Sequence, residues 1–293
     1  MNIARSADGT KIAYDTTGDG PVLIVSVGAF CTRHTFVAPE ELRRRFTVVT
    51  YDRRGRGDSG DTAPFTPQRE YDDLAAVAAA TGTEPPFVFG HSSGAAIALR
   101  AAAAGLPLAG IAAYEAPFPN EDTPQPALDP AEHIGELVRT GRRGEAVRFW
   151  MSEIARVPAE MLAQLDGAPW ATALEALTPT LPYDVAVTAG GVPTAELASI
   201  TTPVLILGGA NSPAWFRRSV ADQAAATPGA RLQMIDGYDH NIPPEAITPI
   251  LIGFFTASAE TPSVRRGDRT RRRLAARRLA ARRATASGSP ETR

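Results

Sequence analysis

The sequence predicts an α/β protein: a mostly parallel, twisted sheet with helices on both faces and a helical insertion over one edge. Three observations support this fold class. Short apolar runs alternate with segments of helical periodicity, as in strand–helix–strand units. One apolar run ends in a Gly-x-Ser-x-Gly turn and leads into an alanine-rich helix. Between residues 117 and 198 proline is frequent and no clear strand pattern occurs, which indicates the insertion.

The elements of the first half follow in order. Residues 2–16 predict a hairpin, because an Asp-Gly turn signal separates two short runs. Residues 22–27 and 46–51 are continuous apolar runs, which indicate buried strands. The Thr-Pro pair at 66–67 predicts a helix start, with an N-cap residue before proline at the first helical position.

The second half continues the alternation. The apolar run from residue 87 and the strand expected at 109–114 enclose the alanine-rich helix. The insertion holds two amphipathic pieces, and the sheet then resumes with two strands that are each followed by a helix. These elements are the pieces 131–139 and 145–154, the strands 203–207 and 231–235, and the helices 213–226 and 244–255.

The chain divides into three parts. We expect a core of residues 1–116 and 199–257, a helical cap or lid of 117–198, and a basic tail of 258–293. The tail holds eleven arginines against three acidic residues, whereas the whole chain has a net charge of −2, so the core and cap together are acidic. Its arginine pairs recur every five residues and do not share a helix face, so we expect a solvated, disordered tail. Such a tail suits loose contact with an anionic surface but no specific nucleic-acid recognition.

Composition excludes several classes of protein. Hydrophobic residues are 44% and charged residues 21%, as in soluble globular proteins. One cysteine, Cys31, excludes an internal disulfide framework. The start of the sequence has no signal-peptide pattern, and no run approaches the roughly 20 apolar residues of a membrane span, so we expect a cytoplasmic protein. Neither a metal nor a cofactor is expected: ligand spacing is missing, and the glycine motif at 55–60 precedes turn residues instead of opening a helix.

The Gly-x-Ser-x-Gly turn at residues 90–94 is the strongest functional signal. Gly90 and Gly94 remove the Cβ atoms that would clash where a strand turns sharply onto a helix. The turn should hold Ser92 in a strained conformation with its hydroxyl exposed above the sheet edge. The Ser93 N–H then lies at the helix start, where an oxyanion is favoured.

Three separated motifs agree with one another. They are Asp-Arg-Arg-Gly-Arg-Gly-Asp-Ser at 52–59, Gly-His-Ser-Ser-Gly at 90–94 and Gly-Tyr-Asp-His at 237–240. In order and spacing they resemble the α/β-hydrolase superfamily with a helical cap, over residues 2–257. The resemblance implies the α/β-hydrolase fold and a catalytic triad in the chain order Ser, acid, His.

The resemblance assigns the nucleophile to Ser92 and the base to His240. A serine hydroxyl needs an imidazole to take its proton, and the loop after the last strand places the base. The other three histidines are expected to be structural or solvated: His34, His91 and His133.

The resemblance also implies an oxyanion hole with two backbone donors. One is the Ser93 N–H, and the other comes from the loop after residues 22–27. Gly28-Ala29 occupies that place in the absence of the usual His-Gly, which is tolerable because only backbone is required. The Ala29 N–H is therefore the second predicted donor, with Phe30 next in line.

The acid departs from the common family pattern. After residues 203–207 the family has Gly-x-x-Asp, but this chain has Gly209-Ala-Asn-Ser-Pro, without a carboxylate. Some superfamily members carry the acid after the preceding strand, which implies Glu115. Asn211 as a neutral orienting group is the alternative, and Ser212 before proline indicates an N-cap.

The expected function is a serine hydrolase that cleaves a carboxylic ester, thioester or lactone of a small, partly apolar molecule. Serine in place of Asp at the elbow excludes the alkyl-ester mechanism of dehalogenases and epoxide hydrolases. Phe30, Trp150 and Trp170 are the candidate pocket residues. The alternatives are a cofactor-free perhydrolase or carbon–carbon hydrolase on the same triad, and a non-catalytic ligand-binding homologue.

Overall fold

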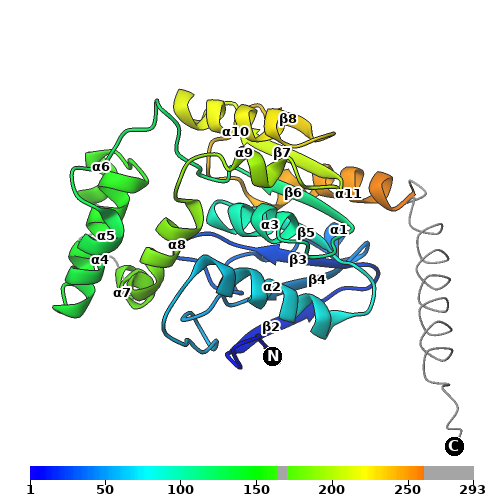
Figure 1. Ribbon diagram of the computed structural model, residues 1–293, viewed down its shortest axis with the longest axis horizontal. Helices are drawn as coiled ribbons and strands as arrows, with labels where there is room; N and C mark the ends of the chain where they lie inside the picture. The colour runs from blue at the N-terminus through cyan, green and yellow to red at the C-terminus, as the bar shows by residue number, and fades with distance from the viewer. Residues whose placement is uncertain (164–169, 261–293) are drawn as a thin grey trace, which may run out of the picture. The chain divides into compact units, whose positions relative to one another are not determined.

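The protein is built on one eight-stranded sheet, seen in a computed structural model that describes residues 1–163 and 170–260 (Figure 1). The strand order is β1-β2-β4-β3-β5-β6-β7-β8. The predicted tail from residue 261 on lies outside the described residues. The strands are β1 (Asn2–Arg5), β2 (Lys11–Thr17), β3 (Val22–Ser26), β4 (Thr47–Tyr51), β5 (Phe87–His91), β6 (Gly110–Tyr114), β7 (Val204–Gly209) and β8 (Arg231–Ile235).

The sheet is parallel from β4 to β8, as the alternation of strands and helices predicts. The N-terminal hairpin β1–β2 adds two antiparallel strands at the β4 edge. In the parallel part Ser26 pairs with Gly90, and His91 pairs with Tyr114. The carboxyl ends of β3, β5 and β6 therefore meet at the same edge, where ligands bind in open α/β sheets.

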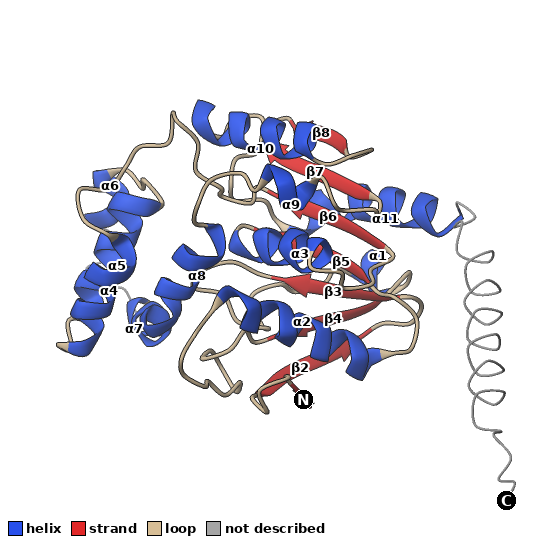
Figure 2. Ribbon diagram, in the orientation of Figure 1, coloured by secondary structure: helices blue, strands red, loops and turns tan. Residues whose placement is uncertain are grey.

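Helices cover both faces of the sheet (Figure 2). One face carries α2 (Pro67–Thr81), α3 (Ser93–Ala103), α9 (Thr194–Leu197) and α10 (Ala214–Ala226), and the other carries α1 (Glu40–Arg43) and α11 (Pro244–Glu260). Each layer has its own apolar core, with Leu74 and Ile97 fully buried on the first face and Leu42 and Phe255 on the second. None of the described helices is both long and apolar enough to cross a membrane.

The insertion is helical, as predicted. Its elements are α4 (Pro130–Arg139), α5 (Arg143–Phe149), the π-helical turn Trp150–Ile154, α6 (Ala159–Leu162), α7 (Ala171–Leu177), the 3-10 turn Thr178–Thr180 and α8 (Leu181–Thr188). Ile134, Leu137, Ala146 and Leu181 form a small core of its own. Helix α8 packs against α3 beside the carboxyl ends of the strands (Figure 1). Residues 1–255 accordingly form one compact unit that includes the insertion.

Candidate active site

The turn between β5 and α3 has the strained geometry that the sequence predicts. Ser92 has φ 58° and ψ −131°, which is rare for a residue with a side chain. A Cβ on Gly90 would lie 2.5 Å from the Ala95 Cα, and one on Gly94 would lie 2.1 Å from the Ser26 carbonyl oxygen. Both positions therefore require glycine. The Ser92 N–H donates to the Tyr114 carbonyl at 2.9 Å, while its hydroxyl has no hydrogen-bond partner among the described residues.

Glu115 and His240 form a hydrogen-bonded pair at the ends of β6 and β8. The His240 Nδ1 lies 2.8 Å from the Glu115 Oε2. The other carboxylate oxygen of Glu115 accepts from the Gly209 N–H at 2.8 Å and from the Ser212 hydroxyl at 2.6 Å. The Glu115 side chain is fully buried, and its backbone has φ 48°. Asn211 is exposed, and its backbone N–H donates to the Tyr238 carbonyl. Glu115 is therefore the group that orients the His240 ring in this structure.

Contrary to the prediction from the sequence, Ser212 does not cap helix α10. Helix α10 begins at Ala214, Pro213 occupies the N-cap position, and no side chain caps the helix. The Ser212 hydroxyl donates to Glu115 instead, in a contact 97 residues apart in sequence. The Ser-Pro sequence is the same whether the serine caps the helix or binds a distant carboxylate, so only the tertiary structure shows which partner the hydroxyl takes.

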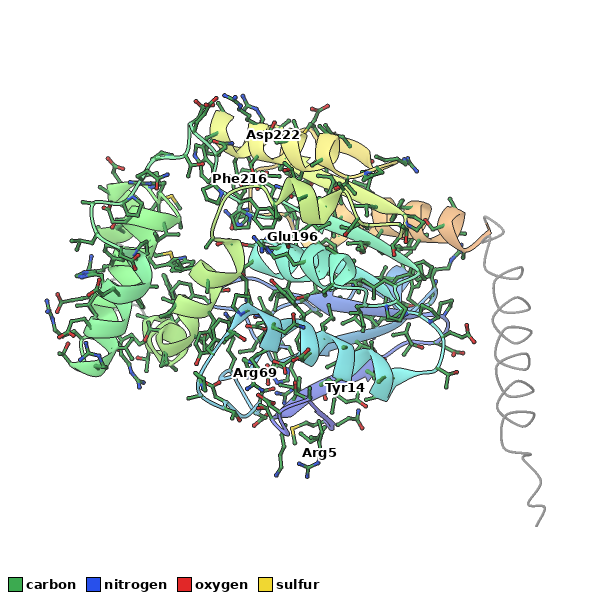
Figure 3. All side chains as sticks on the ribbon, in the orientation of Figure 1. Arg5, Tyr14, Arg69, Glu196, Phe216 and Asp222 are labelled. Carbon is green, nitrogen blue, oxygen red and sulfur yellow. The ribbon has the colours of Figure 1, made fainter. Side chains whose placement is uncertain are left out.

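The loop that carries His240 is held from two sides. The His91 Nε2 lies 2.9 Å from the His240 carbonyl oxygen, and the Tyr114 hydroxyl donates to the Asp239 carbonyl. Burial lowers the pKa of His91 to about 4, and the nearby His240 acts in the same direction. His91 is therefore neutral at neutral pH, and its Nε2 carries the proton that it donates. Phe216 of α10, labelled in Figure 3, stacks on the His240 ring with centroids 5.1 Å apart.

The loop after β3 lies directly on the elbow. A Cβ on Gly28 would be 2.6 Å from the Ser92 Cβ and 3.0 Å from its Oγ, so the glycine backbone takes up this space. Arg56 donates from Nη1 to the Gly28 carbonyl at 2.6 Å. Phe30 in this loop has φ 57°, which is rare for a residue with a side chain. The N–H of Ala29 donates no hydrogen bond within the described part of the chain and is free for a ligand.

The Asp-Arg-Arg motif at 52–54 braces these loops. Asp52 accepts a backbone hydrogen bond from Arg33 at 2.7 Å and pairs with its guanidinium. Arg54 makes two hydrogen bonds of 2.8 Å to Asp73 of α2. Asp52 and Arg53 thus hold the loops around the site with paired charges, whereas Arg54 anchors the motif to α2.

A cavity of about 250 Å³ lies between the insertion and the core. Most of its lining is apolar or proline, with Trp150, Trp215, Ile154 and Val185 contributing large side chains, and no lysine or arginine lines it. The lining residues are Ser93, Pro117, Pro119, Thr123, Pro124, Gln125, Pro126, Pro130, Trp150, Glu153, Ile154, Asp184, Val185, Thr188, Ala189 and Trp215. Sequence reasoning missed Trp215, because the start of α10 has no local feature that marks it as part of a pocket.

The predicted pocket residues have three different positions. Trp150 lines the cavity. Phe30 packs edge-on against Trp150, with centroids 6.1 Å apart, but does not itself line the cavity. Trp170 is 51% exposed at the start of α7 and lies outside this cavity, so the structure does not support it as a lining residue there. An aromatic residue in a helical insertion faces either the core or the solvent, depending on which side of its helix it occupies. The many prolines around these helices hide their periodicity in the sequence, so that side could not be predicted.

Two other sequence observations concern metals and the cysteine. In residues 1–163 and 170–260, no group of three or more His, Cys, Asp or Glu is placed to hold a metal ion. Cys31 is partly buried, and burial raises the pKa of its thiol. Cys31 therefore lacks the lowered pKa of a reactive cysteine and serves as packing.

Comparison with known proteins agrees with the fold. Residues 22–247 match the alpha/beta hydrolase family, and the chain belongs to this family. An alpha/beta hydrolase from Sphaerobacter thermophilus DSM 20745 is 42% identical in a structural match with TM-score 0.81, which covers 87% of this chain and all of that one. A curated relative, the uncharacterized hydrolase YraK of Bacillus subtilis, is 34% identical over 95 residues, or 31% of this chain. The match spans 35% of that relative's length.

More distant structures share the fold alone. A thermophilic esterase from Thermogutta terrifontis is 20% identical with TM-score 0.67, covering 88% of this chain and 98% of its own. The enol-lactonase from Burkholderia xenovorans LB400 is 20% identical with TM-score 0.66, covering 87% of this chain and 100% of its own. At this identity they show the fold of this chain, and the match of residues 22–247 shows its family.

Proposed function

We propose that this hydrolase cleaves a carboxylic ester, thioester or lactone of a small, partly apolar molecule through an acyl-enzyme on Ser92. The observation that carries this proposal is the 2.8 Å hydrogen bond between His240 Nδ1 and the buried Glu115, next to the strained Ser92, whose N–H binds the carbonyl of Tyr114 directly before Glu115. A carboxylate on Nδ1 fixes the imidazole tautomer whose other nitrogen can accept a proton from a serine hydroxyl. An esterase and an enol-lactonase among the structural neighbours are compatible with this substrate class.

In the first half-reaction the Ser92 hydroxyl transfers its proton to the His240 Nε2, and its oxygen bonds to the substrate carbonyl carbon. The carbonyl oxygen becomes an oxyanion, which the N–H groups of Ala29 and Ser93 stabilise; one such donor is worth about 3–4 kcal/mol. The bond to the leaving oxygen or sulfur then breaks, and that atom takes the proton from His240. In the second half-reaction water repeats these steps and releases the acid, while Glu115 stabilises the imidazolium in both.

The cavity supports a small, uncharged group as the part of the substrate that is bound there. Its volume of about 250 Å³ and its Trp, Ile, Val and Pro lining favour an apolar group. Its ionisable lining residues, Glu153 and Asp184, are both acidic, so a carboxylate on the substrate would find no cation there.

A fluorophosphonate probe tests the proposed function without knowledge of the substrate. We expect covalent labelling of the wild-type protein at Ser92, located by peptide mass spectrometry, and none in Ser92→Ala. Labelling that persists in Ser92→Ala would refute the assignment of the nucleophile, and an unlabelled wild type would favour the non-catalytic alternative. A panel of p-nitrophenyl esters of increasing acyl length then measures how large a group the site accepts.

A further inference from the structure

Both predicted oxyanion donors are linked to one carboxylate of the insertion, that of Asp184. Asp184 lies on α8, and its side chain is 1% exposed. Its Oδ1 accepts from the Ser93 hydroxyl at 2.6 Å and from the Arg53 Nη1 at 2.5 Å. Its Oδ2 accepts from the Arg56 Nη2 at 2.6 Å. Three partners from the core thus converge on a single residue of the insertion.

The link through Arg56 acts on the first donor, the N–H of Ala29. Arg56 binds Asp184 with Nη2, the Gly28 carbonyl with Nη1 at 2.6 Å, and the Thr180 hydroxyl with Nε at 3.0 Å. In a planar trans peptide the carbonyl and the following N–H point in opposite directions. A guanidinium on the Gly28 carbonyl therefore directs the Ala29 N–H to the opposite side of the peptide. It also polarises that peptide, which strengthens the N–H as a donor.

The link through Ser93 acts on the second donor. Ser93 is the first residue of α3, so its N–H has no acceptor within the helix. Its hydroxyl is held between Asp184 and the Arg53 Nη1, which lies 3.0 Å away. Because the side chain is 2% exposed and fully hydrogen-bonded, it fixes the first turn of α3 and with it the direction of the N–H.

We propose that Asp184 is a positioning residue that sets the geometry of the oxyanion hole from the insertion. The hole is then complete only with α8 packed on the core. This role rests on the proposed function, since it requires acyl transfer at Ser92. The charges around Asp184 are balanced, because Arg53 also pairs with the buried Glu70 at 2.7 Å. Burial raises the pKa of Asp184, but attraction to Arg53 and Arg56 outweighs it and holds the pKa below its usual value, so Asp184 is ionised.

Substitution of Asp184 by Asn separates positioning from simple charge effects. The change removes a negative charge near the developing oxyanion, so a purely electrostatic role predicts a faster reaction. A positioning role predicts a slower one, because the Asn amide cannot accept from Arg53, Arg56 and Ser93 together. We expect kcat to fall about 10–100-fold at nearly constant KM, less than the roughly 10²–10³-fold loss on removal of one donor.

The rate of fluorophosphonate labelling at Ser92 measures this effect directly. In this reaction the Ser92 Oγ–P bond forms, the P–F bond breaks, fluoride leaves, and His240 takes the serine proton. The matched control is Asp73→Asn, because Asp73 is equally buried and pairs with an arginine, but its hydrogen bonds go to Arg54 and not to the loop after β3 or to the Ser93 hydroxyl. We expect labelling to slow about 10–100-fold in Asp184→Asn and to stay within about threefold of wild type in Asp73→Asn.

A second variant covers the case in which Asp184→Asn does not fold. Ser93→Ala removes one link to Asp184 and leaves both arginine pairs, so it should fold and should label several-fold more slowly. The pH profile of labelling should keep its shape in both variants, whereas a general loss of structure would change it. If Asp184→Asn and Ser93→Ala both fold and are labelled at the wild-type rate, the positioning role of Asp184 is overturned, but the proposed function is not. A wild type that does not label would overturn the proposed function itself.

Discussion

Glu115 is a buried carboxylate whose hydrogen bonds come from His240, from a hydroxyl and from a backbone N–H, without an arginine or lysine. This arrangement fully occupies one oxygen and leaves the other to His240. The family's usual carboxylate after β7 is absent here, and that strand supplies donors instead, through Gly209 and Ser212. In the proposed triad the acid therefore follows β6, and the end of β7 supplies the donors that hold it.

Glu115→Gln tests this residue as the orienting acid. The amide has the same size and can still accept from Gly209 and Ser212, but its NH₂ then faces His240 and favours the wrong tautomer. By analogy with Asp→Asn in a serine-protease triad, we expect kcat to fall by up to about 10⁴-fold with little change in KM. Steady-state kinetics on a p-nitrophenyl ester measures both. Asn211→Ala is the control and should keep nearly full activity; the reverse result would assign the orienting role to Asn211.

His91 predicts an acid sensitivity of the fold. Its pKa falls from 6.5 to about 4 on folding, chiefly by burial. Between these pH values the unfolded chain binds a proton that the folded chain does not. The free energy of unfolding should therefore fall as the pH decreases through this range, by at most about 1.4 kcal/mol per pH unit. Urea unfolding of wild type and His91→Gln at several pH values should show a shallower slope in the variant.

The exposed His34 provides the control for this measurement. His34→Gln should follow the wild-type dependence on pH. Equal slopes in wild type and His91→Gln would show that His91 takes up its proton equally well in the folded protein.

At the scale of secondary structure, the turns that follow the parallel strands hold the site under strain. Ser92 follows β5 and Glu115 follows β6, and both have positive φ, as does Phe30 in the loop after β3. Such conformations cost about 1–3 kcal/mol each and persist only where the surrounding packing enforces them. Backbone hydrogen bonds to neighbouring strands hold two of these residues, because the Ser92 N–H donates to the Tyr114 carbonyl and the Glu115 N–H to the Leu207 carbonyl.

Two glycines, one tightly packed and one with open space around it, test whether the packing around the loop after β3 matters for activity. Gly28→Ala would place a methyl group 2.6 Å from the Ser92 Cβ, so we expect activity to fall at least about 100-fold through displacement of the oxyanion loop. Gly135 lies in α4 with open space at its Cβ position, and Gly135→Ala should stabilise the fold by about 0.5–1 kcal/mol at unchanged activity. Kinetics and thermal unfolding measure both. Full activity in Gly28→Ala would show that the loop can move away without consequence.

The fold could be predicted in detail because its signals are local. Apolar runs bounded by turn residues gave the parallel strands within two residues, an Asp-Gly turn signal gave the N-terminal hairpin, and the glycines at 90 and 94 placed the elbow. Asp184, Ser212 and Phe216 could not be found in this way. Each acts through a contact with a residue about 25 to 130 positions away, and a carboxylate, a hydroxyl or an aromatic ring in a helix has the same local pattern whether it faces a partner or not.

At the scale of the whole molecule, the insertion contacts both the cavity and the loops of the proposed oxyanion hole. It supplies Trp150 and Val185 to the cavity and Asp184 to the loops below it. Arg53 and Arg56, which bind the lining residue Asp184, are paired with carboxylates, and Arg156 likewise pairs with the lining residue Glu153. The described residues therefore combine an ion-paired arginine cluster at the loop after β3 with a cavity whose lining holds no lysine or arginine.

This combination predicts selectivity against acidic acyl groups. We expect p-nitrophenyl butyrate to exceed p-nitrophenyl hemisuccinate in kcat/KM by at least about 100-fold, because the hemisuccinate would place an unpaired carboxylate in the cavity. Ile154→Arg adds a cation to the lining and should narrow the ratio mainly through the hemisuccinate, whereas Ile154→Met, which adds none, should not. Equal kcat/KM of the wild-type enzyme for the two esters would mean that the acyl group binds outside this cavity. Hydrolysis of both esters would still be consistent with the proposed serine mechanism.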